Sequence, residues 1–418
     1  MHSDKPLEMP SASTLRKSIQ VSTLILSWLI AIGIFIQISG KVWIESGSGR
    51  NTQIYIFLLL PALLITLCKI AQRKLQLSLH YSIWILFLIW IALSTLWATN
   101  SPTDPLALAK RGMYIALYLA AIHYTMRINE QLLRRAIFSG IAIIAIGALA
   151  TIVYQFAVLE IPLGYRTHRL YRLDIGEFAD YGWPVAAGIF HGAAAMYALY
   201  AAIEKDQRLG KSVFWGAIFL ILASYVLLTY TRGAWIALFV GSIATIVLQR
   251  SRKGWLALAL GALTAGILVT IFWPNLMVEL HTRQLSGRGP IWQYFFEQMQ
   301  GKWLLGHGLG TPFEYHWPDG HAISPHAHSL YLQQIYDSGL IALSTMSAGI
   351  VILLVKAWSL RENYWVKLAL PALIYGLVAM ITDVERIFTR PGDYWTVFWL
   401  PIAILLAVPS KINCPKTA

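Results

Sequence analysis

Histidine is concentrated in one stretch of the chain, residues 273–336, which is the longest segment between hydrophobic runs. It holds six of the eleven histidines, namely His281, His307, His316, His321, His326 and His328. The last two stand where the next apolar run begins, and a neutral imidazole can take a proton from a hydroxyl group near neutral pH. If both lay on one helix, their i, i+2 spacing would turn the rings to different faces. We therefore expect only one of them to face a substrate and the other to orient it or to cap the helix.

Other chemistries fit these residues less well. A zinc site is the main rival, but the sequence has no HExxH motif and none of these histidines are four residues apart. A Ser-His-Asp hydrolase would need a nucleophile elbow such as GxSxG, which is missing. The paired carboxylates of a glycosidase are not evident either. For His281, His307 and His316 we favour surface positions in a polar loop.

The elements that must position these residues are membrane helices. The chain of 418 residues is 57% hydrophobic and only 13% charged, about half the charged share of soluble domains. Apolar runs long enough to cross a bilayer as helices recur from end to end, and open sheet edges cannot lie in lipid. The sequence therefore predicts an all-α polytopic membrane protein with about twelve spans: 20–38, 53–70, 81–97, 106–123, 135–158, 183–203, 213–229, 234–249, 255–273, 328–355, 366–382 and 395–410.

Lysine and arginine are unevenly distributed between the loops. With the N-terminus in the cytoplasm, each short inner loop carries three basic residues, and most of the 33 lie on that side. The net charge of +13 then reflects these clusters, not a face for nucleic acid. We therefore expect cytoplasmic termini and one membrane domain, residues 1–418, with a periplasmic insertion at 274–327. No cleavable signal peptide, disulfide framework or internal repeat is apparent.

The arginines that break this rule on the outer side suggest a bound anion. Arg232 lies in a very short turn between two spans, where a cation needs a partner. Arg288 precedes the helical pattern IWQYFFEQM, and the amide groups at a helix start attract anions. Its guanidinium could add a two-pronged contact to phosphate.

Two further outer segments carry charge. Arg166, Arg169 and Arg172 are spaced by three, which would place them on one face of a helix. A basic segment lying on the membrane surface explains this spacing equally well. The segment DVERIFTRPGD at 383–393 supplies Asp383 and Arg386. GHGLG at 306–310 lacks the preceding strand and the full pattern of a nucleotide loop.

A histidine base, several arginines and a membrane together fit the transfer of a group from a phosphate-bearing lipid. Arginines would hold and neutralise the leaving pyrophosphate, and the histidine would activate an acceptor hydroxyl. This hypothesis uses the outer cations and the imidazoles in one site at the membrane surface.

Four motifs resemble the O-antigen ligase family, whose superfamily also holds O-antigen polymerases and O-linked oligosaccharyltransferases. They are TRGAWIAL at 231–238, SGRGPIWQ at 286–293, LLGHGLG at 304–310 and HAHSLYLQQIYDSGLIAL at 326–343. Their order and the large late periplasmic loop match the family. The resemblance implies a fold like that of GT-C glycosyltransferases.

The resemblance also implies the reaction. Family ligases pass O-antigen glycan from undecaprenyl pyrophosphate to a sugar hydroxyl of lipid A–core at the periplasmic face of the inner membrane, with inversion and without ATP, metal or another cofactor. By motif, Arg232 and Arg288 match the pyrophosphate-binding arginines and His328 the base, with Asp383 a functional acid. His326, Arg386, Arg166, Arg169 and Arg172 are candidate supporting residues. Ser329 stands where the family usually has Asn.

Three alternatives remain open at this point. A polymerase extending the glycan and a transferase to protein hydroxyls would keep the same chemistry with another acceptor. A transporter of lipid-linked sugar is the third, but transporters tend to show repeats and polar groups near the bilayer centre. Here the polar residues gather at the outer edge. Membrane lipids are expected partners, and nucleic acid is not.

Overall fold

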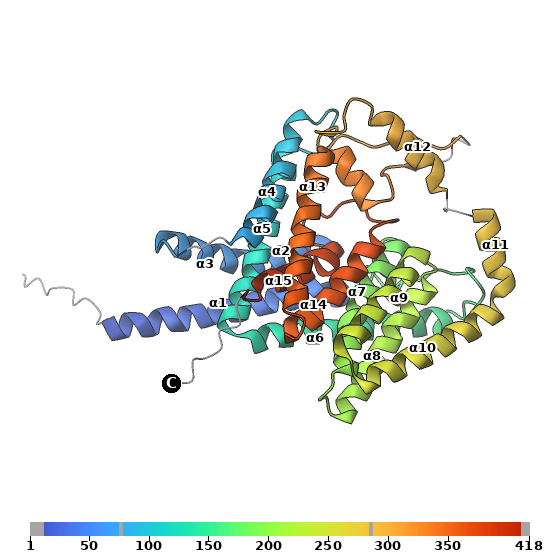
Figure 1. Ribbon diagram of the computed structural model, residues 1–418, viewed down its shortest axis with the longest axis horizontal. Coiled ribbons are helices and arrows are strands. Elements are labelled where there is room, and N and C mark those ends of the chain that lie inside the picture. Colours follow the sequence, from blue (N-terminus) through green and yellow to red (C-terminus); the bar gives the residue numbers. More distant parts are fainter. Residues whose placement is uncertain (1–11, 75–77, 284–286, 319, 321, 411–418) are drawn as a thin grey trace, which may run out of the picture.

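The computed structural model describes residues 12–74, 78–283, 287–318, 320 and 322–410. It is built almost wholly of helices (Figure 1). They are α1 (Ala12–Trp43), α2 (Gly47–Ile54), α3 (Leu60–Ala71), α4 (Leu79–Ser94), α5 (Pro105–Ile128), α6 (Glu130–Val153), α7 (Pro184–Ile203), α8 (Leu209–Leu228), α9 (Arg232–Gln249), α10 (Arg252–Ile271), α11 (Trp273–Arg283), α12 (Arg288–Gln298), α13 (Leu330–Ser359), α14 (Tyr364–Ala379) and α15 (Leu400–Ala407).

Short segments of other types join or extend these helices. Three π-helical stretches are Tyr55–Leu59, Tyr154–Val158 and Trp395–Trp399, and Thr95–Trp97 forms a turn of 3-10 helix. Two short strands, β1 (Tyr315–His316) and β2 (Ile323–Ser324), pair in antiparallel fashion within the insertion.

The prediction of an all-α polytopic membrane protein is confirmed. Within the described ranges, ten helices are long and apolar enough to cross a membrane, and the shorter apolar helices Tyr364–Ala379 and Trp395–Ala407 account for the last two predicted spans. The helix expected after Arg288 is present as α12, with Pro290 in its first turn. Helix α11 was not predicted, because residues 274–287 carry no apolar run long enough to cross a membrane and were expected to be loop.

Burial divides the helices into central and lipid-facing ones. Of the most apolar 18 residues of α7, 94% are buried, against 6% for α10. Small residues let other helices approach α7 closely, as at Gly192, where a Cβ atom would collide with the ring of Tyr375 on α14. Helix α10 is apolar all round and lies at the edge of the molecule in Figure 1. Such exposure has no hydrophobic cost in lipid.

The loops predicted to be cytoplasmic lie together on one face. Arg134, after the α5–α6 turn, reaches Glu204 of the α7–α8 loop at 3.8 Å. Trp365, at the start of α14, donates to Glu130 at 3.3 Å, and Ser251 of the α9–α10 turn donates to the Ile203 carbonyl at 2.6 Å. Contacts of this kind support the alternation of loops that the basic residues predicted.

The insertion docks against a break in α13. At Gly339, φ is 74° and the helix is interrupted. The opened backbone is paired with the insertion, since the Leu340 amide donates to the Trp303 carbonyl at 2.8 Å and the His307 amide to the Tyr336 carbonyl at 2.7 Å. Gly306, with φ 71°, lies so close that a Cβ atom would be 2.7 Å from the Gly339 nitrogen. The motifs LLGHGLG and DSG thus fix this junction.

A small core holds the rest of the insertion onto α13. Its buried members include Ile291, Phe295 and Met299 of α12 or its end, together with Phe313 and Tyr336. Burial of these large side chains is the main force that seats α12 above one end of the bundle (Figure 1). The start of α12 is therefore placed over the ends of α9 and α14.

Candidate active site

The first element of the site is an ion pair at the start of α12. Arg288 donates from Nε to the Thr382 carbonyl at 2.7 Å and from Nη2 to a carboxylate oxygen of Asp383. The Asp383 side chain is 2% exposed and that of Arg288 is 17% exposed. Gly287, with φ 76°, turns the chain into the helix just before this residue. Arg288 is thus held by two partners that follow α14 in the sequence.

Helix α9 begins beside the same carboxylate. A Cβ atom at Gly233 would be 2.7 Å from Asp383 Oδ2 and equally close to Thr382 Oγ1. The missing side chain therefore lets the Thr382–Asp383 segment contact the first turn of α9, next to Arg232. The two arginines expected to bind pyrophosphate belong to separate helices, and Asp383 is the point at which those helices meet.

The loop before α7 contributes one more cation to this region. Arg169 donates to the Thr229 carbonyl at 2.8 Å and to the Thr231 hydroxyl at 3.2 Å, directly before Arg232. Arg166, Arg169 and Arg172 would share a face only on a helix, and residues 159–183 form no helix. The turns instead separate them: Arg166 has φ 59°, and Arg172 pairs with Asp174.

The arginines around Asp383 determine the net charge of this part of the site. Burial raises the pKa of the Asp383 carboxyl, while the positive charges of Arg288 and Arg169 oppose that rise. The single carboxylate of Asp383 therefore lies near the guanidinium groups of both Arg288 and Arg169, and the region keeps an excess of positive charge. Such a region favours a polyanionic group such as a diphosphate.

His326 and His328 lie side by side, not on different faces. Helix α13 starts only at Leu330, so the i, i+2 argument for a helix does not apply. His328 has φ 50°, and its amide donates to His326 Nδ1 at 3.1 Å. The ring centroids are 4.0 Å apart. A left-handed backbone conformation at a residue other than glycine is uncommon and is often found at functional sites.

Their hydrogen bonds give the two rings different roles. Because His326 Nδ1 accepts a backbone amide, the proton of its neutral ring is on Nε2, where it can only donate. His328 Nε2 shares a hydrogen bond of 3.0 Å with the Ser324 hydroxyl. His328 is therefore the better candidate for a base, and His326 for a donor that orients a substrate or the backbone.

Both imidazoles are neutral at physiological pH. Burial, followed by the charges of His328, Arg386 and Arg288, lowers the pKa of His326 to about 3. Burial and the charge of Arg288 lower the pKa of His328 to about 4. The effect of Arg288 on both rings shows that the arginine and histidine parts of the site are close enough to interact electrostatically.

The residue between the two histidines is fixed on both sides. The Ala327 carbonyl accepts from Trp292 Nε1 at 3.0 Å, and its amide donates to Gln333 Oε1 at 2.9 Å. Gln333 in turn donates to Asp337 at 3.0 Å. Helices α12 and α13 therefore clamp the peptide that carries both rings, which sets their positions before any substrate binds.

Arg386 supports this clamp and does not join the Arg288 pair. It contacts both carboxylate oxygens of Asp337, at 2.5 and 3.0 Å, and pairs with Glu385. Burial is the largest single influence and opposes its charge, but Asp337 and Glu385 together outweigh it and the pKa of Arg386 rises. The chain Arg386, Asp337, Gln333, Ala327 thus connects the segment after α14 to the histidines.

The other histidines of the stretch do not join this pair. The His307 ring stacks on Tyr336 with centroids 4.5 Å apart and contacts the Gln298 carbonyl at 3.0 Å. His316 is exposed beside Glu314, and His281 is exposed on α11. His321 lies outside the described residues. Among the residues described, no three His, Cys, Asp or Glu side chains form a potential metal site.

Comparisons with known proteins bear directly on this site. Residues 217–347, from the middle of α8 into α13, match a family model described as O-antigen ligase. The matched part carries Arg232, Arg288, His326 and His328. This part of the chain is therefore similar to O-antigen ligases. The chain is also 25% identical over 397 residues to an O-antigen ligase of Pseudomonas aeruginosa, covering 93% of this chain and 92% of that protein.

The family resemblance predicted from the four motifs is thus confirmed. With the apolar helices, it supports a multi-pass membrane enzyme of the glycosyltransferase type that belongs to lipopolysaccharide biosynthesis. The segment that matches the family model ends before Asp383 and Arg386. Asp383 nevertheless contacts Arg288 of that segment, and Arg386 holds the histidines of that segment through Asp337.

Several residues of this site were not among the candidates predicted from the sequence. Trp292, Gln333, Asp337 and Thr382 had no assigned role. Gln333 and Asp337 did carry a signal, since polar side chains spaced i, i+4 at the start of a long apolar helix need a buried partner. Thr382 acts through its backbone carbonyl, which no side-chain pattern reveals.

Proposed function

We propose that this protein transfers O-antigen glycan from undecaprenyl pyrophosphate to a sugar hydroxyl of lipid A–core. The observation that carries the proposal is the meeting of α9, α12 and the Asp383 segment, which gathers cations next to a clamped pair of neutral histidines. The family similarity supplies the class of substrate, and the site geometry agrees with the chemistry that class requires.

In this reaction, Arg232 and Arg288 bind the diphosphate, and His328 takes the proton of the attacking hydroxyl. The bond between the anomeric carbon and the diphosphate oxygen breaks as the new glycosidic bond forms, and the electron pair leaves with the undecaprenyl pyrophosphate. Attack from the face opposite the leaving group inverts the anomeric centre. Fixed cations stabilise the charge that develops on that group.

Donor binding would also strengthen the base. A pKa of about 4 makes His328 a weak proton acceptor before the donor binds. Part of that depression comes from the charge of Arg288, which a bound diphosphate would offset. His328 would then become more basic only when the donor is in place, so the acceptor is activated in the complete complex.

The arrangement in the cell follows from the same proposal. The chain would be one domain of the bacterial inner membrane, with both termini in the cytoplasm. The insertion at 274–327 would carry α11 and α12 on the periplasmic side. The site would then face the leaflet in which the donor lipid presents its glycan.

A transfer assay with purified components tests the proposal. Full-length protein in detergent would receive undecaprenyl-pyrophosphate-linked glycan and lipopolysaccharide that carries only the core. We expect core bearing glycan as the product, without ATP, and far less product from Arg288→Ala protein that still elutes as a single species. Glycan extended on the carrier lipid would indicate a polymerase instead. No product from the wild type with any acceptor would contradict an enzyme and favour a transporter.

A further inference from the structure

A second cationic site lies on the face of the molecule opposite the histidines. A cavity of about 490 Å³ opens between α6 and α8, near the loops predicted to be cytoplasmic. Three basic residues line it, together with three aromatic rings and two glutamines: Arg134, Arg135, Lys211, Phe138, Phe214, Trp215, Gln131 and Gln207. Nothing in the transfer reaction uses these residues.

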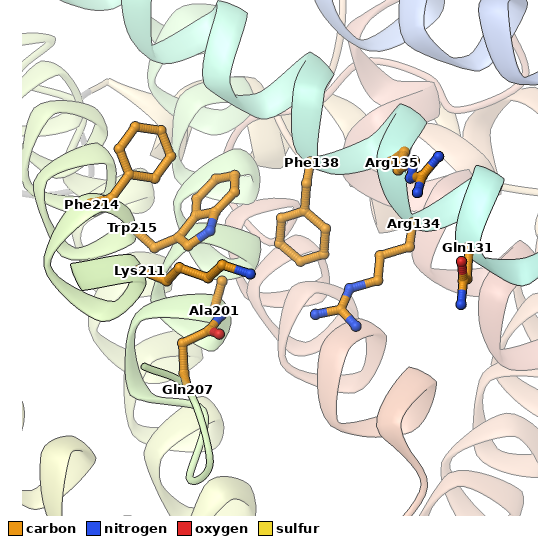
Figure 2. Close-up of a pocket in the computed structure, with 9 residues that line it drawn as sticks. All are labelled: Gln131, Arg134, Arg135, Phe138, Ala201, Gln207, Lys211, Phe214 and Trp215. Carbon is orange, nitrogen blue, oxygen red and sulfur yellow. The ribbon is translucent and has the colours of Figure 1, made fainter. Parts of the chain in front are cut away.

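The positive charge of the cavity exceeds its negative charge. Arg134 is partly neutralised, because it lies 3.8 Å from Glu204, and its guanidinium stacks over the Tyr364 ring at 4.7 Å. Arg135 and Lys211 are exposed. Figure 2 shows the Lys211 amine and the Arg134 guanidinium extending toward one another from opposite sides of the cavity. An anion between them would be contacted from both helices.

One wall of the cavity is apolar and continues onto the lipid-facing surface. The Phe138 and Trp215 rings are 5.0 Å apart, and Phe214 is 5.3 Å from Trp215. Phe214 is 54% exposed and Val213, beside it on α8, is 63% exposed. The cavity therefore combines a charged end with an apolar path, as an amphipathic ligand requires.

We propose that this cavity binds an anionic phospholipid of the cytoplasmic leaflet. The headgroup phosphate would lie between Lys211 and Arg134, and an acyl chain would pass over Phe214 and Trp215. Basic pockets between transmembrane helices on the cytoplasmic side suit such headgroups. A free phosphate would use the cations but leave the aromatic wall exposed. The site is separate from the Arg288 region, and its occupant is a membrane lipid and not a glycan donor.

Lipid titration of the purified full-length protein tests this proposal. The protein would be held in a zwitterionic detergent, and bound lipid would be counted by native mass spectrometry. The three probes are phosphatidylglycerol, phosphatidylcholine and inorganic phosphate. We expect phosphatidylglycerol to bind, with Lys211→Gln weakening its affinity about fivefold, the effect of one cation near an anionic surface. Lys205→Gln, an exposed loop residue outside the cavity lining, should keep the wild-type affinity.

A second variant tests the apolar wall. Phe214→Ala, at a half-exposed position, should also weaken phosphatidylglycerol binding while transfer activity is unchanged. Equal binding of phosphatidylcholine would overturn the proposal, as would equal weakening by the two lysine variants. Inorganic phosphate that competes fully with the lipid at millimolar concentration would show an anion site without a lipid. Lipid affinity that is unchanged in both Lys211→Gln and Phe214→Ala would also reject the cavity.

Discussion

Asp383→Asn is the sharpest perturbation of the proposed mechanism, because the role we propose for Asp383 is to position Arg288 and not to contact the substrate. Its carboxylate holds Arg288 at the start of α12, and the side chain is 2% exposed. Asparagine keeps the shape but removes the charge. We expect kcat/KM for transfer to fall about 100-fold, the loss typical of a catalytic group displaced by about 1 Å.

Two single variants and their double variant show whether Asp383 acts through Arg288. Arg288→Ala alone should lower kcat/KM by at least about 100-fold, as does the loss of one charge-stabilising donor. If the carboxylate serves only to orient that guanidinium, the double variant should be no slower than Arg288→Ala. The coupling energy would then be about 2.7 kcal/mol, which equals the 100-fold factor.

Thermal unfolding tests the pairing of Asp383 with Arg288 independently of the reaction rates. In Arg288→Ala, the buried Asp383 carboxylate loses its main counter-charge. A buried polar group without its partner destabilises the folded protein. Adding Asp383→Asn removes that cost, so the double variant should melt at a higher temperature than Arg288→Ala. Rates would come from the transfer assay at several donor concentrations, with size-exclusion chromatography as the folding control. Losses that multiply in the double variant would show that Asp383 has its own role in the chemistry and would refute the positioning argument.

Further predictions concern the histidines and the docking of the insertion. Protonation inactivates a base, and the pKa of His328 in the free enzyme is about 4. We therefore expect kcat/KM to stay level through pH 6.5 and to fall only as the pH approaches 4. A kcat/KM that has fallen by half near pH 6.5 would contradict this. The acid limb of kcat should lie at higher pH than that of kcat/KM, because the bound diphosphate offsets the charge of Arg288. His328→Gln should lower kcat by about 100-fold or more without changing donor affinity, whereas weakened donor binding would make the residue a ligand. Gly308→Ala should lower the melting temperature far more than Gly301→Ala. Both have positive φ, but only at Gly308 would a Cβ atom meet the Ala98 backbone; equal effects would rule out close approach as the cause.

The sequence by itself determined the helical architecture and the alternation of the loops. Apolar runs must form helices in lipid because every backbone group needs an internal partner. Basic clusters between runs such as 183–203 and 213–229 then separate the loops into two sets, and contacts such as Arg134 to Glu204 support that separation. These features depend on local composition and are therefore readable from the chain.

The motifs also pointed to the correct part of the chain without giving its geometry. The sequence showed that LLGHGLG is rich in glycine. It did not show that this segment pairs with the broken backbone of α13 at Gly339. The spacing of Arg166, Arg169 and Arg172 suggested a helix face, whereas the structure holds Arg169 beside Arg232 and pairs Arg172 with Asp174. Spacing predicts a shared face only when the helix exists, and the helix itself depends on tertiary contacts.

Only the tertiary structure decided how the site is assembled. Asp383 meets Gly233 and Arg288 because α9, α12 and the end of α14 are packed together by side chains far apart in the chain. The two histidines lie side by side because Ala327 between them is clamped by Trp292 and Gln333. Long-range packing of this kind leaves no local pattern, so the residue types of the site could be predicted from the sequence but their convergence could not.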